Sequence, residues 1–227
     1  VTTLSALSSS GSIYITEANG ITVDAVSVSV TEFNADATTT EVDDAAQSDL
    51  STGADSDGNI VLVATTGAIT LNDGSDGDST AVSADGSGNI LLDALSGSLI
   101  ANADILSGTG HVTLKAGANL MLNGGVDVTT SAAGTISLDA EGGALTMAGD
   151  ANVTATDSSA RLAAQGNITL GNVTATNVSV VSAAGSLVNA ADSSTNVTAS
   201  NLRLQSQGSL GASDRHLTTD VTTLSAL

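Results

Sequence analysis

Two short stretches of the sequence concentrate side-chain oxygen atoms next to glycine. One is ADSDGN at residues 54–59, and the other is NDGSDGDS at residues 72–79. Hard cations such as calcium bind carboxylate and amide oxygens, and glycine allows the tight turn that brings such ligands together. The candidate calcium ligands in these two stretches are Asp55, Asp57, Asn59, Asp73, Asp76 and Asp78.

Neither acidic stretch has the complete spacing of a known calcium loop. The ligand positions of the EF-hand are not all filled, and the glycine- and aspartate-rich nonapeptide of RTX repeats is absent. Two solvated acidic turns are therefore the simpler interpretation, and a specific calcium site is the alternative hypothesis. We expect no other cofactor.

The composition of the chain restricts its fold and its partners. The 227 residues have a formal net charge of −20 and include one Phe, one Tyr, no Trp and no Cys. Without cysteine, neither a disulfide framework nor a thiolate metal site can form. So acidic a chain repels nucleic acid and anionic lipid, and no run of residues approaches the ~20 apolar residues of a membrane span. We therefore expect no nucleic-acid binding and no membrane insertion.

A short sequence pattern recurs along the chain, and the strands and turns that it specifies would position the two acidic stretches. Residues 60–69, IVLVATTGAI, alternate apolar side chains with other residues and then pass through a glycine to a further apolar residue. The period of two predicts a strand, a tight turn and a second strand. Copies of the pattern occur at residues 90–99, 112–121, 136–145 and 178–187. A unit repeated in this way builds a stack in which each copy depends on its neighbours.

A third threonine-rich segment lies between successive copies of this pattern. It reads NVTAT or a close variant at residues 126–130, 152–156, 172–176 and 196–200. Three strands per repeat predict an all-β fold, a parallel β-helix or β-solenoid with three strands in each coil. The copies are spaced by about 24 residues, which gives about nine coils in 220 residues. We expect a right-handed helix, because crossovers between parallel strands have that hand.

Three segments depart from this regular pattern or extend it. Residues 26–30 alternate Val with Ser, and this period of two predicts a strand. Residues 34–57 are acidic and poor in apolar side chains, so we expect an insertion that leaves the stack. Residues 72–79 are expected to form a smaller acidic loop.

The two ends of the sequence are the same. The heptapeptide VTTLSAL occupies residues 1–7 and again residues 221–227, which is a separation of 220 positions. We interpret residues 1–227 as a single β-helical repeat segment of a tandem array with that period. In such an array the coils of one repeat stack on those of the next.

Several coils resemble those of a known family. The stretches that carry the resemblance are GNIVLVATTGAITL (58–71), GNILLDALSGSLI (88–100) and GTISLDAEGGALTM (134–147). They are similar to coils of the filamentous haemagglutinin-like family, the large repetitive β-helical adhesins of bacteria. The resemblance implies an extracellular or cell-surface location and a rod-like, filament-forming role.

The sequence therefore predicts a structural protein, the repeat unit of a large extracellular filament or adhesin shaft, and not an enzyme. Its partners would be copies of itself or adjacent repeats, joined end to end, and a host or neighbouring cell surface or a polysaccharide. A calcium-dependent adhesive module is the alternative. A β-helical polysaccharide lyase or hydrolase is the third hypothesis, but its carboxylates Asp93 and Asp139 are separated by the coil of Lys115, and such a ladder of charges is more typical of a solvated surface.

Overall fold

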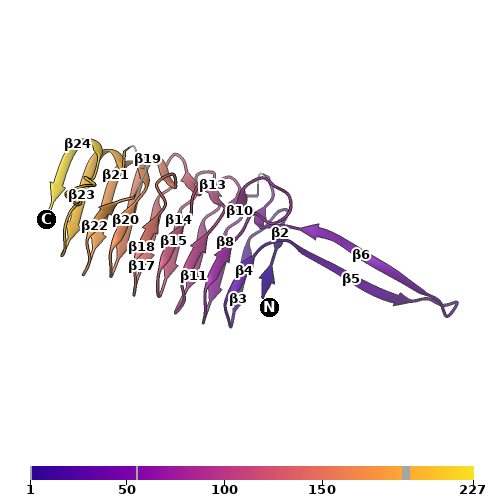
Figure 1. Ribbon diagram of the computed structural model, residues 1–227. Helices are drawn as coiled ribbons and strands as arrows, with labels where there is room; N and C mark the ends of the chain where they lie inside the picture. The colour runs from indigo at the N-terminus through magenta and orange to yellow at the C-terminus, as the bar shows by residue number, and fades with distance from the viewer. Residues whose placement is uncertain (1, 55, 191–194) are drawn as a thin grey trace.

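The computed structural model describes residues 2–54, 56–190 and 195–227, and in these residues all regular structure is β-strand. The strands stack along one axis into an elongated solenoid, from which a single hairpin projects near the N-terminal end (Figure 1). The expected all-β solenoid fold is therefore confirmed.

One long parallel sheet is built from strands that follow the glycine turns. Its order is β1-β4-β9-β12-β15-β18-β20-β22, and every pairing in it is parallel. These strands are β1 (Thr3–Leu4), β4 (Ile21–Val23), β9 (Ile69–Leu71), β12 (Leu99–Ala101), β15 (Leu120–Leu122), β18 (Leu145–Met147), β20 (Ile168–Leu170) and β22 (Leu187–Asn189).

A second parallel sheet begins as two separate ladders. One ladder contains β3 (Ile13–Glu17), β8 (Ile60–Ala64), β11 (Ile90–Ala94), β14 (Val112–Ala116) and β17 (Ile136–Ala140). The other contains β2 (Ala6–Ser8), β7 (Leu50–Thr52), β10 (Thr80–Ala84), β13 (Asp104–Ser107) and β16 (Asp127–Thr130). The ladders join in long strands that pair along both, namely β19 (Asn152–Ala164), β21 (Asn172–Ser182), β23 (Val197–Ser206) and β24 (Thr219–Ala226).

The core of the stack is one continuous apolar column. In β8, β11, β14 and β17 the first, third and fifth side chains are buried and the other two are partly exposed, as a period of two requires. Leu62, Leu92, Leu114 and Leu138 pair in register from coil to coil. Because each buried side chain lies on its equivalents above and below, medium-sized aliphatic residues fill the interior without aromatic rings.

The turn glycines are required by the close approach of neighbouring coils. A Cβ atom built on Gly97 would overlap the carbonyl oxygen of Gly67, one coil away. No side chain fits between backbones stacked at strand spacing, and this explains why glycine recurs in the pattern.

Asparagine side chains form a second set of ladders on the outside of the turns. In one ladder the amide of Asn72 donates to Asp24 Oδ2 at 2.8 Å, Asn102 donates to Asn72 Oδ1 at 2.9 Å, and Asn123 donates to Asn102 Oδ1 at 2.5 Å. Each side chain thus bridges two coils at the same corner of the stack.

Substitution of Asn102 by alanine tests the contribution of this ladder. Asn102→Ala is expected to lower the free energy of unfolding by about 1 kcal/mol, because two exposed hydrogen bonds are lost. Urea titration followed by circular dichroism measures the change. Asn123→Ala is the matched control, since it removes one bond of the same ladder, and its effect should be smaller. Equal effects at the two positions would contradict this account.

The projecting hairpin contains the strand expected at residues 26–30 and changes the expected limits of the acidic insertion. Strands β5 (Val26–Phe33) and β6 (Thr39–Gln47) pair with each other in an antiparallel two-stranded sheet outside the stack. Residues 26–30 thus form the strand that their alternation predicts, but this strand lies outside the stack, and Val28 and Val30 are each 51 % exposed. Period-two alternation predicts a strand with one apolar face, but it does not say which sheet receives that strand.

The acidic insertion also has different limits from those expected. Its residues 39–47 are strand rather than loop, and the chain is back in the stack by β7, where Leu50 is fully buried. The excursion is therefore the hairpin of residues 26–47. An edge of charged and polar side chains is compatible with a strand that faces only solvent.

The two copies of the terminal heptapeptide occupy different positions. In the first copy Leu4 pairs with Val23 in the sheet of β1, whereas in the second copy Leu224 pairs with Leu202 in β23. Identical sequence thus lies on two different ladders. The tandem array stays a prediction, and it requires one copy to change its pairing when a neighbouring repeat is present.

Candidate metal centre

Three aspartates meet where the hairpin returns to the stack. Asp49 lies between β6 and β7, and Asp76 and Asp78 lie in the acidic turn of residues 72–79 between β9 and β10. One carboxylate oxygen from each residue lies within 4.8 Å of the corresponding oxygens of the other two. We call this group the acidic triad. Asp49 is buried, and the other two are exposed.

The acidic turn is held against the base of the hairpin by serine and glycine. The backbone N–H of Ser75 donates to Ser48 Oγ at 3.0 Å, which places the turn beside the residue that precedes Asp49. Gly74 has a φ of +73°, and a Cβ atom there would lie 2.5 Å from Ser48 Oγ. Within the turn, Asp78 Oδ1 accepts a hydrogen bond from the N–H of Thr80 at 2.8 Å. These contacts fix the positions of Asp76 and Asp78 relative to Asp49.

Asp49 differs from the other two residues of the acidic triad because it is buried. Asp49 is 6 % exposed, and its Oδ1 is buried without a hydrogen-bond partner among the described residues. Burial is the largest cause that raises the pKa of Asp49, and together with the negative charges of Asp76 and Asp78 and a hydrogen bond to Asp76, which only a protonated pair can make, it brings that pKa to about 7. At neutral pH this carboxylate is therefore stable only when a proton or a cation neutralises it.

The predicted ligands of the 72–79 loop are thus gathered at one place. Asp76 and Asp78 belong to the triad, and Asp73 is close enough for its charge to contribute to the raised pKa of Asp49. Asp73 Oδ1 is itself buried and accepts no hydrogen bond. Two buried carboxylate oxygens without partners therefore lie in the same small region.

The predicted ligands of the 54–59 loop have other partners. Asp57 Oδ1 accepts hydrogen bonds from the N–H and the hydroxyl of Ser87, at 2.7 and 3.0 Å. Asn59 Oδ1 accepts from the N–H and the amide of Asn89, at 2.9 and 2.8 Å. Both side chains join successive coils, and neither belongs to the triad. Asp55 lies outside the described residues.

Sequence reasoning missed Asp49. The residue lies between Ser48 and Leu50, within the acidic residues 34–57 but outside the two glycine-containing stretches in which oxygen ligands alternate. In the folded chain Asp49 has a φ of 65°, which is uncommon for a residue other than glycine, but the sequence gives no sign of it. Only the fold brings it to Asp76, which is 27 positions further along the chain.

The charged ladder on the outer face of the solenoid has the register expected from the pattern. Asp93 pairs with Lys115, and Lys115 pairs with Asp139. The Lys115 ammonium lies 2.7 Å from Glu141 Oε1, and this contact raises the pKa of the lysine. Cations between carboxylates reduce repulsion along the ladder, and this arrangement agrees with a solvated charged surface.

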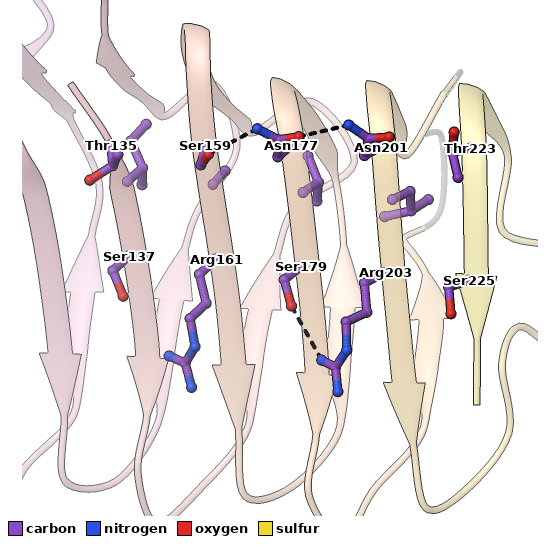
Figure 2. A pocket seen from close by; sticks show the side chains of 14 residues that line it. Thr135, Ser137, Ser159, Arg161, Asn177, Ser179, Asn201, Arg203, Thr223 and Ser225 are labelled. Atoms are coloured by element: carbon purple, nitrogen blue, oxygen red, sulfur yellow. Dashed lines mark hydrogen bonds between the residues drawn. The ribbon is translucent and has the colours of Figure 1, made fainter. Parts of the chain in front are cut away.

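A shallow groove of about 580 Å³ lies on the same face nearer the C-terminal end (Figure 2). Asn177 donates to Ser159 Oγ at 3.3 Å, and Asn201 donates to Asn177 Oδ1 at 2.8 Å, in another side-chain ladder along the rim. Arg161 and Arg203 also line it, but Arg161 is paired with Asp139 at 3.2 Å. The groove is an open surface whose polar groups largely bind one another.

Comparisons with protein-family models, with curated proteins and with solved structures gave no match. Among the described residues, no helix is long and apolar enough to cross a membrane.

Proposed function

We propose that the chain is a structural segment of a large extracellular filament or adhesin shaft at the cell surface. In this proposal it forms a right-handed parallel β-helix with three strands per coil and about nine coils in 220 residues. The observation that carries the proposal is the continuity of the parallel ladders and of one apolar column along the stack. An uninterrupted core of this kind suits a rod, whose task is to span distance.

Unpaired strand edges support the association of copies end to end. In the part of the chain that the structure describes, β24 pairs only with β23, and at the other end of the stack β2 and β3 have partners on one side only. Free backbone N–H and C=O groups on an edge strand are a template for pairing with another chain. The proposed partners are therefore further copies or repeats of the same chain, with a host or neighbouring cell surface or a polysaccharide as the target of the assembled rod.

A calcium-dependent adhesive module is the second candidate function, and the acidic triad favours it. A polysaccharide lyase or hydrolase has less support, because the outer carboxylates Asp93 and Asp139 are separated by Lys115 and do not face each other. We therefore propose a non-enzymatic role.

Electron microscopy of the purified chain tests the shaft. We expect rods that lengthen into filaments as the concentration rises, with an axial repeat of about 43 Å, the rise of nine coils at about 4.8 Å each. Compact particles would contradict the shaft, and rods that never lengthen would contradict association end to end.

A substitution on the edge strand sharpens this test. Thr223→Lys places a charge on β24 and is expected to shorten the filaments, because charged side chains on an edge block further pairing. Thr31→Lys makes the same change on the exposed hairpin strand β5 and should leave filament length unchanged. Equal filament lengths for the two variants would show that β24 is not the contact.

A further inference from the structure

We propose that Asp49, Asp76 and Asp78 bind a divalent cation of the calcium class, and that this ion fastens the base of the β5–β6 hairpin to the 72–79 turn. The proposal does not depend on the shaft function. A rod that binds no ion would contradict the ion site but not the shaft, and a compact protein that binds one would contradict the shaft but not the ion site.

The distances within the acidic triad fit one shared ion. Calcium lies 2.3–2.6 Å from its oxygen ligands, so two oxygens on opposite sides of the ion are roughly 4.6–5.2 Å apart. The three carboxylate oxygens lie within 4.8 Å of one another. One ion placed among them can therefore contact all three without a large movement of the backbone.

The buried carboxylate of Asp49 supplies the independent evidence for a ligand. Exposed acidic residues often cluster without binding anything, but Asp49 is 6 % exposed and its Oδ1 has no hydrogen-bond partner. An ionised carboxylate left in this state costs free energy unless a cation is coordinated to it. Among the described residues no Lys or Arg forms an ion pair with the triad. A dissolved cation is the partner that fits.

The character of the turn favours calcium over magnesium. Calcium accepts six to eight oxygen ligands in a flexible geometry, whereas magnesium demands a near-ideal octahedron and gives up its water reluctantly. Gly74 and Gly77 both have positive φ values, of 73° and 75°, which glycine adopts without strain and which allow the backbone of this turn to bend sharply. The triad supplies three carboxylates, and the remaining ligands would be water and backbone carbonyl groups.

The ion would join segments that are far apart in sequence. Asp49 follows the last residue of β6, Gln47, by two positions, and the other two ligands belong to the turn between β9 and β10. A Cβ atom on Gly74 would approach both Ser48 and the backbone N of Ala25, so the turn touches both legs of the hairpin. A two-stranded ribbon is marginally stable by itself. An ion at its base would fix the direction in which it projects.

Calorimetric titration of the calcium-free chain with calcium chloride tests the site. We expect binding of one ion to the triad, with magnesium competing weakly. Asp76→Asn and Asp49→Asn are each expected to weaken binding about ten-fold or more, since affinity follows the number of charged ligands. Asp76 is exposed, so its variant keeps the fold even if Asp49→Asn does not. Asp43→Asn, an exposed strand residue of the hairpin, is the matched control and should change the affinity less than about two-fold.

Two results would overturn the site. One is the absence of binding at millimolar calcium, and the other is an equal affinity of the Asp76→Asn and Asp43→Asn variants. Hydrogen exchange of residues 26–47 then tests the clamp. Calcium is expected to slow exchange in the hairpin of the Asp43→Asn control but not in Asp76→Asn. Unchanged exchange in a protein that binds calcium would overturn the clamp.

Discussion

Leu92→Ala is expected to lower the free energy of unfolding by about 2–5 kcal/mol. Leu92 is fully buried in β11 and lies in register between Leu62 and Leu114 of the adjacent coils. Truncation opens a cavity that the column cannot close, because backbone pairing fixes the spacing of the coils. The effect should therefore be as large as that of a core substitution in a globular protein.

The neighbouring residue Leu91 provides the matched control. It lies on the same strand, but its side chain points outward and is only partly buried. Leu91→Ala is expected to cost less than about 1 kcal/mol. Thermal and urea unfolding of the two variants, followed by circular dichroism, measure the difference. Comparable losses at both positions would contradict the inward and outward alternation of β11.

Calcium-free protein is expected to lose stability as the pH rises, through the titration of Asp49. Its ordinary pKa of 3.8 is raised to about 7 in the folded chain by burial and by the charges of Asp76, Asp78 and Asp73. A raised carboxyl pKa means that the folded state holds the proton more tightly than the unfolded state. The contribution of protonated Asp49 to the free energy of unfolding is therefore fully present below pH 4, and it is lost as the pH rises through 7. The resulting decrease in the free energy of unfolding is at most about 4 kcal/mol. Solvent screens the charges of the exposed aspartates, and we therefore expect a decrease of about 2 kcal/mol.

Comparison with Asp49→Asn isolates this effect, because the amide cannot ionise. In chelator, the wild-type chain should become less stable relative to the variant between pH 4 and pH 8. Other carboxyl groups, such as Asp24 and Asp57, have lowered pKa values and contribute equally to both proteins. The free energies of unfolding at several pH values provide the measurement. Parallel pH profiles for the two proteins would contradict a raised pKa at Asp49.

The stacked part of the fold was predictable from sequence because its information is local. In β17 the alternation of Ile136, Leu138 and Ala140 with Ser137 and Asp139 specifies a strand and its buried face. The recurrence of that pattern specifies which strands pair. The hairpin was missed because Val26–Phe33 has the same alternation, and only the partner strand decides where such a segment goes.

The candidate site was predictable only in part. Asp76 and Asp78 lie together in the sequence and are neighbours in space. Asp57 and Asn59 looked similar, but their oxygens are engaged by Ser87 and Asn89 of the next coil. No local pattern distinguishes an oxygen that joins coils from one that remains without a partner. Asp49 depends wholly on the path by which the hairpin returns to the stack.

Unequal pairing between coils has a mechanical consequence. Backbone hydrogen bonds between coils run along the rod axis, so a pulling force on the ends loads each interface in turn, and the interface with the fewest bonds opens first. Strand β7 pairs with β10 at only two positions, whereas β11 and β14 pair at five. Strand β13 also pairs with β16 at two positions, so we expect a stretched rod to yield at one of these short ladders before the longer ones. An ion bound by the acidic triad would join Asp49, beside β7, to the turn before β10 and would strengthen that short ladder under tension.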